Sequence, residues 1–154
     1  MPRHSIRRLL LGVIALPFAL GLAACGSESD EMAGLSGEVI EKIAPPVGSS
    51  WSEVVDKTPD GCYRMGTPEA PIKLIEFASL TCPHCAYFAE ESSAELRDTF
   101  VTSGRVSWEF RNFILNPIDL TMAMMVRCGS PDSFFALTEQ SFEGQDTIVQ
   151  AWDN

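Results

Sequence analysis

The clearest chemical signal in this sequence is a pair of cysteines that stand two residues apart. Cys82 and Cys85 enclose Pro83 and His84 in the segment "SLTCPHCAYF". Such a pair can hold a metal ion, form a structural disulfide or exchange electrons with the thiols of another protein. The residues around the pair favour one of these chemistries.

Three features favour thiol–disulfide exchange. Cys82 is predicted at the start of a helix with Pro83 at its first position, where unpaired N–H groups and the helix dipole stabilise a thiolate. His84 in the first turn can donate to the Cys82 sulfur or place positive charge near it. Cys85, one turn further on, can close the disulfide or resolve a mixed one. The sequence therefore predicts Cys82 as the nucleophile, Cys85 as the resolving thiol and no separate cofactor.

The competing chemistries fit the sequence less well. A structural zinc site takes four ligands, often two such pairs, and this chain has one pair with Cys62 and Cys128 far from it. Haem attachment requires a histidine directly after the second cysteine, where Ala86 stands. An inert disulfide at Cys82 and Cys85 would close a loop of two residues and gain little entropically. We therefore predict no metal at the motif.

The N-terminus, residues 1–24, is predicted to be an export signal. Three arginines precede an apolar run that is too short for a comfortable membrane span, and small residues follow it. The sequence "LAAC", which ends at Cys25, resembles the lipobox of bacterial lipoproteins, and this implies lipidation of Cys25 and anchoring to a membrane. The alternative is ordinary cleavage near Ala24. Either route leads to a compartment in which disulfides persist.

The net charge excludes one class of partner, and two further cysteines remain to be assigned. The formal net charge of −10 over 154 residues argues against nucleic acid as a partner. Cys62 lies in the loop before the first predicted strand, and Cys128 ends a predicted helix. These two either form a second, structural disulfide or remain free thiols, and both alternatives stay open.

The chain after the signal divides into a tether and one α/β domain. Residues 25–50 are small and polar, which predicts a flexible tether with one helical turn near Val39 to Ile43. Residues 51–154 form the domain, and it opens with a loop that includes residues 58–71. A strand over Ile72–Ser79, a helix from Cys82 to Gly104 and a strand over Val106–Phe113 follow, which is a βαβ unit with parallel strands.

Three helices are predicted after this unit. Asn116 caps a helix that runs to Cys128, and Ser130 and Pro131 open another through Phe142; a third begins near Thr147. One face of the first helix is predicted to pack inward, and it comprises Phe88, Ala89, Ser92, Leu96 and Phe100. The predicted core comprises Trp108, Phe110, Phe134 and Phe135. Met122, Met124 and Met125 are predicted to pack between helices, with a methionine-rich peptide-binding surface as the alternative.

Two segments carry a family resemblance. "EFASLTCPHCAYF" and "VSWEFRNFILNPIDLTMA" resemble the DsbA-type thiol:disulfide oxidoreductases of the bacterial envelope. The resemblance implies a thioredoxin-like fold with a helical insertion, protein thiols or disulfides as substrates, a redox partner that recycles the CPHC pair, and a place on the periplasmic side. It also implies that Glu76 is the buried acid beneath the motif, which relays protons to and from Cys85. The alternative for Glu76 is a solvent-facing strand position.

The same comparison predicts that the domain is incomplete. Members of this family carry a cis-proline loop, a β-hairpin and a final helix after the helical insertion, but the only prolines after Cys85 are Pro117 and Pro131, and both fit helix starts. The strand Ile72–Ser79 should lie inside the sheet, yet the sequence offers it one partner, so one edge should be unpaired. The alternative function is therefore a truncated, non-enzymatic lipoprotein that serves as a binding or metal-holding module.

Overall fold

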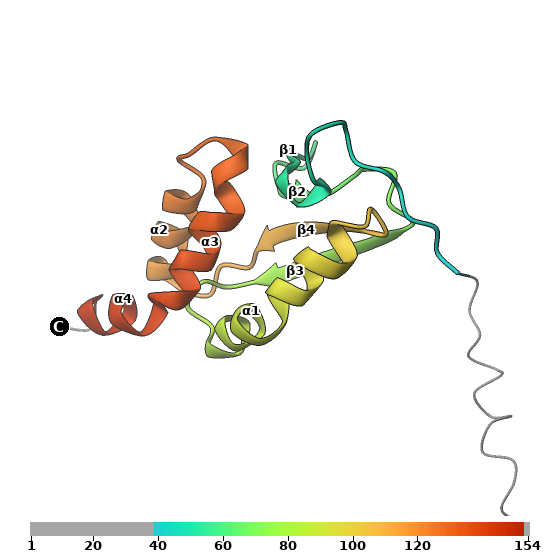
Figure 1. Cartoon of the computed structure of the whole chain (residues 1–154). Coiled ribbons are helices and arrows are strands. Elements are labelled where there is room, and N and C mark those ends of the chain that lie inside the picture. The colour runs from blue at the N-terminus through green and yellow to red at the C-terminus, as the bar shows by residue number, and fades with distance from the viewer. Residues whose placement is uncertain (1–38, 153–154) are drawn as a thin grey trace, which may run out of the picture. The chain divides into compact units, whose positions relative to one another are not determined.

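The fold is a four-stranded sheet with helices packed against it (Figure 1). The computed structural model describes residues 39–152, so the predicted signal, the lipidation site Cys25 and most of the predicted tether lie outside the described residues. The elements in chain order are η2 (Trp51–Glu53), β1 (Val55–Lys57), β2 (Tyr63–Met65), β3 (Ile72–Ala78), α1 (Pro83–Glu95), η3 (Leu96–Val101), β4 (Val106–Asn112), α2 (Pro117–Val126), η4 (Pro131–Ser133), α3 (Phe134–Glu143) and α4 (Gln145–Trp152).

The predicted βαβ unit is present. Strands β3 and β4 pair in parallel along their whole length, from Ile72 opposite Val106 to Ala78 opposite Asn112, and α1 connects them. The thioredoxin-like α/β architecture predicted from the sequence is therefore confirmed.

The prediction of a loop over residues 58–71 was wrong in part. Strand β2 lies within it and, together with β1, forms an antiparallel hairpin, so that the sheet has the order β1-β2-β4-β3. Each of these strands is three residues long. Strands this short lack a readable alternation of apolar and polar residues, and pairing with a neighbour stabilises them instead.

The core lies on the face of the sheet that α1 and α3 cover. Tyr63 stacks on Phe134 with 4.0 Å between ring centroids, and Phe110 meets Phe134 edge-on at 5.6 Å. Trp108 packs against Phe135 at 5.0 Å. All four aromatic residues predicted to be core are buried, and this part of the prediction is confirmed.

The helices after the βαβ unit begin where the sequence predicts. The Asn116 side chain accepts a hydrogen bond from the main-chain N–H of Asp119 at 2.9 Å, and Pro117 occupies the first helical position of α2. Pro131 opens the 3₁₀ turn η4, which leads into α3, and Gly144 follows the last residue of α3. The last helix starts two residues earlier than predicted, at Gln145.

Two predicted packing surfaces differ from the structure. The helix that starts at Pro83 changes to π-helical geometry over Leu96–Val101, and the wider turn places Val101 in the core while Phe100 is exposed. On α2, Met122 is buried, but Met124 and Met125 are both exposed. The prediction that all three methionines pack between helices was therefore wrong for two of them.

The last part of the predicted tether lies against the domain. Ile43 donates its main-chain N–H to Ser103 at 3.1 Å, and Arg105 and Trp51 donate side-chain N–H groups to the carbonyls of Ile40 and Ile43. Gly104 permits this contact, because it has a φ of +73° and any Cβ there would lie 2.6 Å from the Ile43 carbonyl oxygen. Residues 39–46 contain no helical turn, which corrects the predicted one.

Strand β3 forms an edge of the described sheet. It pairs with β4 alone, and Ile72, Ile75 and Phe77 on it are exposed. This agrees with the prediction of one unpaired edge beside exposed apolar side chains. Within residues 39–152, we find no helix that is both long enough and apolar enough to cross a membrane.

Candidate active site at a helix start

The two motif cysteines occupy the first turn of α1. Cys82 is the N-cap residue in an extended conformation, and Pro83 takes the first helical position. The Cys82 carbonyl accepts the main-chain N–H groups of Cys85 and Ala86, both at 3.1 Å. Proline fits at this position because the N–H it lacks would have no helical partner. The local sequence therefore places the Cys82 sulfur at the end of the helix where N–H groups are unpaired.

The pKa values of the two thiols are shifted in opposite directions, with that of Cys82 lowered and that of Cys85 raised. The main-chain N–H of Cys85 lowers the pKa of Cys82 most, and the Cys85 thiol and the main-chain N–H of His84 lower it further. Burial raises the pKa of Cys85, as does its hydrogen bond to the Cys82 sulfur. Both cysteines are free thiols in this structure. The arrangement is a reduced pair in which the Cys85 thiol supports a thiolate on Cys82.

His84 helps to lower the pKa of Cys82 through its main chain, and the contribution of its imidazole remains a prediction. Its side chain is exposed, and its contribution to the acidity of Cys82 comes from its main-chain N–H. Any residue other than proline at position 84 would supply that donor.

Glu76 lies on β3, on the face of the sheet that carries the core. Its carboxylate accepts a hydrogen bond from the indole N–H of Trp108 at 2.8 Å. Burial raises the pKa of Glu76 to about 7, although the Trp108 hydrogen bond opposes this effect. The negative charge of Glu76 in turn helps to raise the pKa of Cys85. A carboxyl group that titrates near neutral pH and interacts electrostatically with the half-buried Cys85 thiol can take and return its proton.

A small cavity adjoins Glu76 between the sheet, α1 and α3. Its lining includes Ser93, Thr138, Trp108, Arg97 and Glu139. Its volume of about 20 Å³ has room for one water molecule. The hydroxyl of Thr138 is buried and has no hydrogen-bond partner among the described residues. A water molecule in the cavity would satisfy this hydroxyl close to the Glu76 carboxyl.

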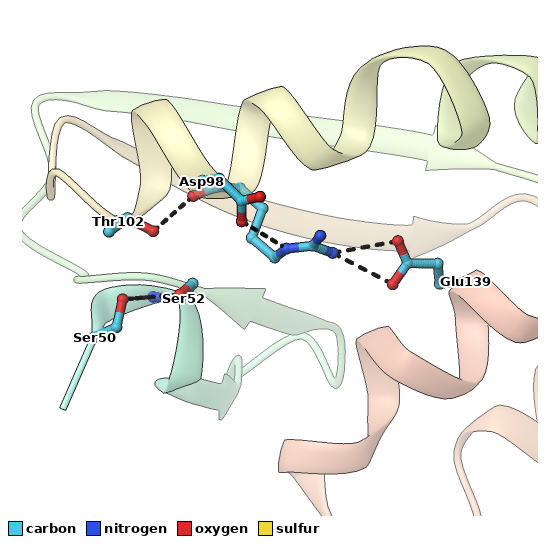
Figure 2. A network of polar contacts seen from close by, with 6 residues as sticks. Ser50, Ser52, Asp98, Thr102 and Glu139 are labelled. Atoms are coloured by element: carbon cyan, nitrogen blue, oxygen red, sulfur yellow. Dashed lines mark hydrogen bonds and ion pairs between the residues drawn. The ribbon is translucent and has the colours of Figure 1, made fainter.

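An ion pair stands at the rim of this cavity. Arg97 on η3 bonds Asp98 at 3.0 Å and Glu139 on α3 at 3.2 Å, and Figure 2 shows Asp98 and Glu139 on opposite sides of the guanidinium group. The same view shows the nearby cap of η2, where Ser50 accepts the N–H of Ser52. The Arg97–Glu139 pair thus connects η3 to α3, and both residues line the same cavity as Glu76.

Sequence reasoning missed two polar residues that hold the motif. Asp119 on α2 accepts the main-chain N–H of Leu80 at 2.9 Å, and Gln145 on α4 donates to the carbonyls of Leu80 at 2.9 Å and Cys82 at 3.2 Å. The spacing "NPID" marks Asp119 as a first-turn residue of a capped helix, which is a usable signal for a capping role. No comparable signal marks Gln145, because its partners lie 63 and 65 residues away.

The other two cysteines are free thiols on neighbouring segments. Arg127 donates to the carbonyl of Gly61 at 2.8 Å, which brings the loop of Cys62 to the end of α2. The thiol of Cys128 bonds the carbonyl of Met124 at 3.2 Å. Both cysteines are reduced in this structure, and the two predicted alternatives, a structural disulfide or free thiols in an oxidising compartment, both stay open.

The chain is similar in sequence and in fold to known thioredoxin-like proteins. The family model described as Thioredoxin matches residues 57–152. A protein-disulfide isomerase from Novosphingobium aromaticivorans superposes with a TM-score of 0.57 at 37% identity, over 59% of this chain and 46% of that one. Alpha-DsbA1 from Wolbachia pipientis superposes with a TM-score of 0.55 at 31% identity, over 58% of this chain and 45% of that one.

Curated relatives match a little over half of this chain. Disulfide bond formation protein D of Bacillus subtilis is 28% identical over 92 residues, which are 57% of this chain and 41% of that protein. The chain spans between 31% and 43% of the length of the curated relatives that it matches. The matched stretch is therefore less than half of each of these relatives.

Proposed function

The chain belongs to the thioredoxin family, and from this premise we propose that it is a thiol:disulfide oxidoreductase that exchanges disulfides with other proteins. The main support for this proposal is the pair of cysteines at one helix start. The lowered pKa of Cys82 makes it a nucleophile, and the raised pKa of Cys85 makes it a protected resolving thiol. Relatives and structural neighbours named for disulfide formation and isomerisation support it.

The exchange proceeds in two balanced steps. The Cys82 thiolate attacks one sulfur of a protein disulfide, forms a mixed disulfide and releases the other sulfur as a thiolate. Cys85 then loses its proton, and its thiolate attacks the Cys82 sulfur and releases the second substrate sulfur. Two electrons have passed from the motif to the substrate. The reverse sequence oxidises a substrate dithiol and leaves the motif reduced.

Glu76 has the role of a proton acceptor in the second step. Cys85 holds its proton at neutral pH because burial raises its pKa, so a base must take this proton before Cys85 can attack. The Glu76 carboxyl has a pKa of about 7, and it returns the proton when the pair is reduced again.

Location and partners belong to the same proposal. The relatives' names support exchange with protein disulfides, and the predicted signal supports export to the bacterial envelope with a lipid anchor at Cys25. A redox partner must then reoxidise or reduce the Cys82–Cys85 pair after each turnover, since the chain itself supplies no net oxidant.

Trapping the mixed disulfide tests this function. We expect Cys85→Ser to accumulate a covalent adduct with a disulfide-bearing protein such as insulin, because Cys82 attacks and nothing resolves the product. Cys82→Ser should form no such adduct, and Cys128→Ser should exchange disulfides as the parent does. Alkylation mapped by mass should label Cys82 first at mildly acidic pH. Faster labelling of Cys85 would reverse the assigned roles. Equal trapping by both motif variants would contradict the assignment of a single nucleophile.

A further inference from the structure

Helices outside the βαβ unit hold the segment that precedes the nucleophile. Ser79–Cys82, here the motif segment, connects β3 to α1. Asp119 binds its Leu80 N–H, and Gln145 binds its Leu80 and Cys82 carbonyls. The Asp119 side chain is fully buried, and Gln145 is 4% exposed. Two buried polar side chains from α2 and α4 thus converge on three peptide groups of one short segment.

These contacts fix the peptide plane that carries the nucleophile. The Cys82 carbonyl accepts three donors, which are the N–H groups of Cys85 and Ala86 at 3.1 Å and the Gln145 amide at 3.2 Å. The orientation of this carbonyl sets where the Cys82 sulfur lies relative to the N–H groups of the first helical turn. Loosening the segment would weaken the hydrogen bonds that favour the thiolate.

Asp119 also acts through its charge. The main-chain N–H of Cys85 lowers the pKa of Cys82 most, and the negative charge of Asp119 opposes that effect. Asp119 and Gln145 therefore bind the same segment, but only Asp119 adds a negative charge that opposes the Cys82 thiolate, whereas the Gln145 amide is neutral. The ionisable side chains around the cysteine pair are His84 on α1, Glu76 on β3 and Asp119 on α2, and Glu90, Glu139, Glu143 and Asp146 line the groove beside Ala86.

We propose that Asp119 and Gln145 are positioning residues for thiol–disulfide exchange, which hold the motif segment and set the reactivity of the Cys82 sulfur. This inference rests on the proposed function of the Cys82–Cys85 pair. It assigns a role to α2, whose Met122, Ala123 and Val126 belong to the core, and to the first residue of α4.

The test compares Asp119→Asn and Gln145→Leu with the exported parent protein. Asparagine keeps one acceptor oxygen for Leu80 and removes the charge, but it gives up the hydrogen bond that the other carboxylate oxygen of Asp119 accepts from the Leu115 N–H at 2.9 Å. Because the charge is lost while the Leu80 contact stays, the pKa of Cys82 should fall and alkylation of Cys82 at mildly acidic pH should become about threefold faster. Leucine has a similar volume but no donor, so the pKa should rise and alkylation should slow about threefold. Asp132→Asn, an exposed change of the same charge on η4, is the matched control and should leave the rate unchanged.

Opposite shifts distinguish positioning from general loosening. Two variants that merely destabilise the fold would both move Cys82 toward the acidity of an ordinary thiol. Shifts in the same direction, or rates equal to the parent in both variants, would overturn the inference while leaving the proposed function intact. A parent whose Cys82 shows no lowered pKa would instead remove the proposed function. If Asp119→Asn loses its cooperative thermal melt, Gln145→Leu decides alone, and a parental rate in that variant overturns the inference.

Discussion

The two faces of the sheet differ in their surroundings: α1 and α3 cover one face, and the other is exposed to solvent. On the face under α1 and α3, Phe110 is 1% exposed and Glu76 is half-buried against Trp108. On the other face, Phe77 is 61% exposed and Ile75 is 46% exposed, and Arg111 lies over the Phe77 ring and pairs with Glu109 at 2.7 Å. The chemistry of the motif depends on the first face, whereas the second has charged and apolar groups in contact with solvent.

Because of this difference, we expect the covered face to govern stability and thiol reactivity and the open face to govern association with other molecules. Neighbouring residues of one strand alternate between the faces, so Glu76 and Phe77 are adjacent in sequence but belong to different environments. A substitution on the covered face should change folding or thiol reactivity. A substitution on the open face should change how the molecule meets other molecules.

The largest expected effect contrasts two phenylalanines on opposite faces. Phe110→Ala should lower the free energy of unfolding by about 3–5 kcal/mol, because it leaves a cavity among packed aromatic rings. Phe77→Ala should cost less than about 1 kcal/mol, since it removes exposed area and one weak cation–π contact. Urea denaturation of both variants measures the difference. Equal losses would mean that the open face is buried in solution.

Glu76 should give the covered face a pH dependence. The folded carboxyl keeps its proton up to a pKa of about 7, but the unfolded one loses it near a pKa of about 4.3. Since the unfolded state binds fewer protons between these values, stability should be fully present below about pH 4 and fall by up to about 4 kcal/mol as the pH rises through about 7.

The variant Glu76→Gln tests this expectation, because glutamine does not titrate. Its stability should stay nearly flat over the same range and exceed that of the parent above neutral pH, while the second exchange step slows. Glu91→Gln, on the exposed surface of α1, is the control and should retain the parental slope. A parental slope in Glu76→Gln would assign the pH dependence to another group.

The open face and the edge of β3 should promote self-association. Strand β3 offers unpaired N–H and C=O groups on one side, flanked by exposed apolar side chains, which is the arrangement that invites pairing between chains. We expect the apparent size of the parent in gel filtration to rise with protein concentration. Ile75→Lys should reduce this association without changing alkylation of Cys82, and an unchanged concentration dependence would place the contact elsewhere.

The smallest effect is expected at His84. Replacing its side chain with leucine should raise the pKa of Cys82 and make the disulfide less oxidising. Alkylation of Cys82 should slow by less than about threefold, since the main-chain N–H that bonds the sulfur remains. Redox titration in glutathione buffers measures it. A loss as large as that caused by removing the Gln145 amide would mean that the imidazole, and not the main chain, dominates.

Local sequence determined the start of the active helix and the order of the main elements. Cys82 at the N-cap, Pro83 after it and the Asn116–Pro117 start of α2 depend on hydrogen bonds within a few residues, so pattern and residue type suffice to place them. The parallel pair β3 and β4 was also predictable, because each of these strands is seven residues long and lies in a predominantly apolar or alternating segment.

Only the tertiary structure decided how the motif is supported. The three-residue strands β1 and β2 form because they pair with neighbours, and the π-helical turn at η3 rotates Val101 inward in place of Phe100. Asp119 and Gln145 reach the motif segment from 39 and 63–65 residues away. Such contacts connect peptide groups through space, and no local pattern of hydrophobicity or capping encodes the partner at the other end.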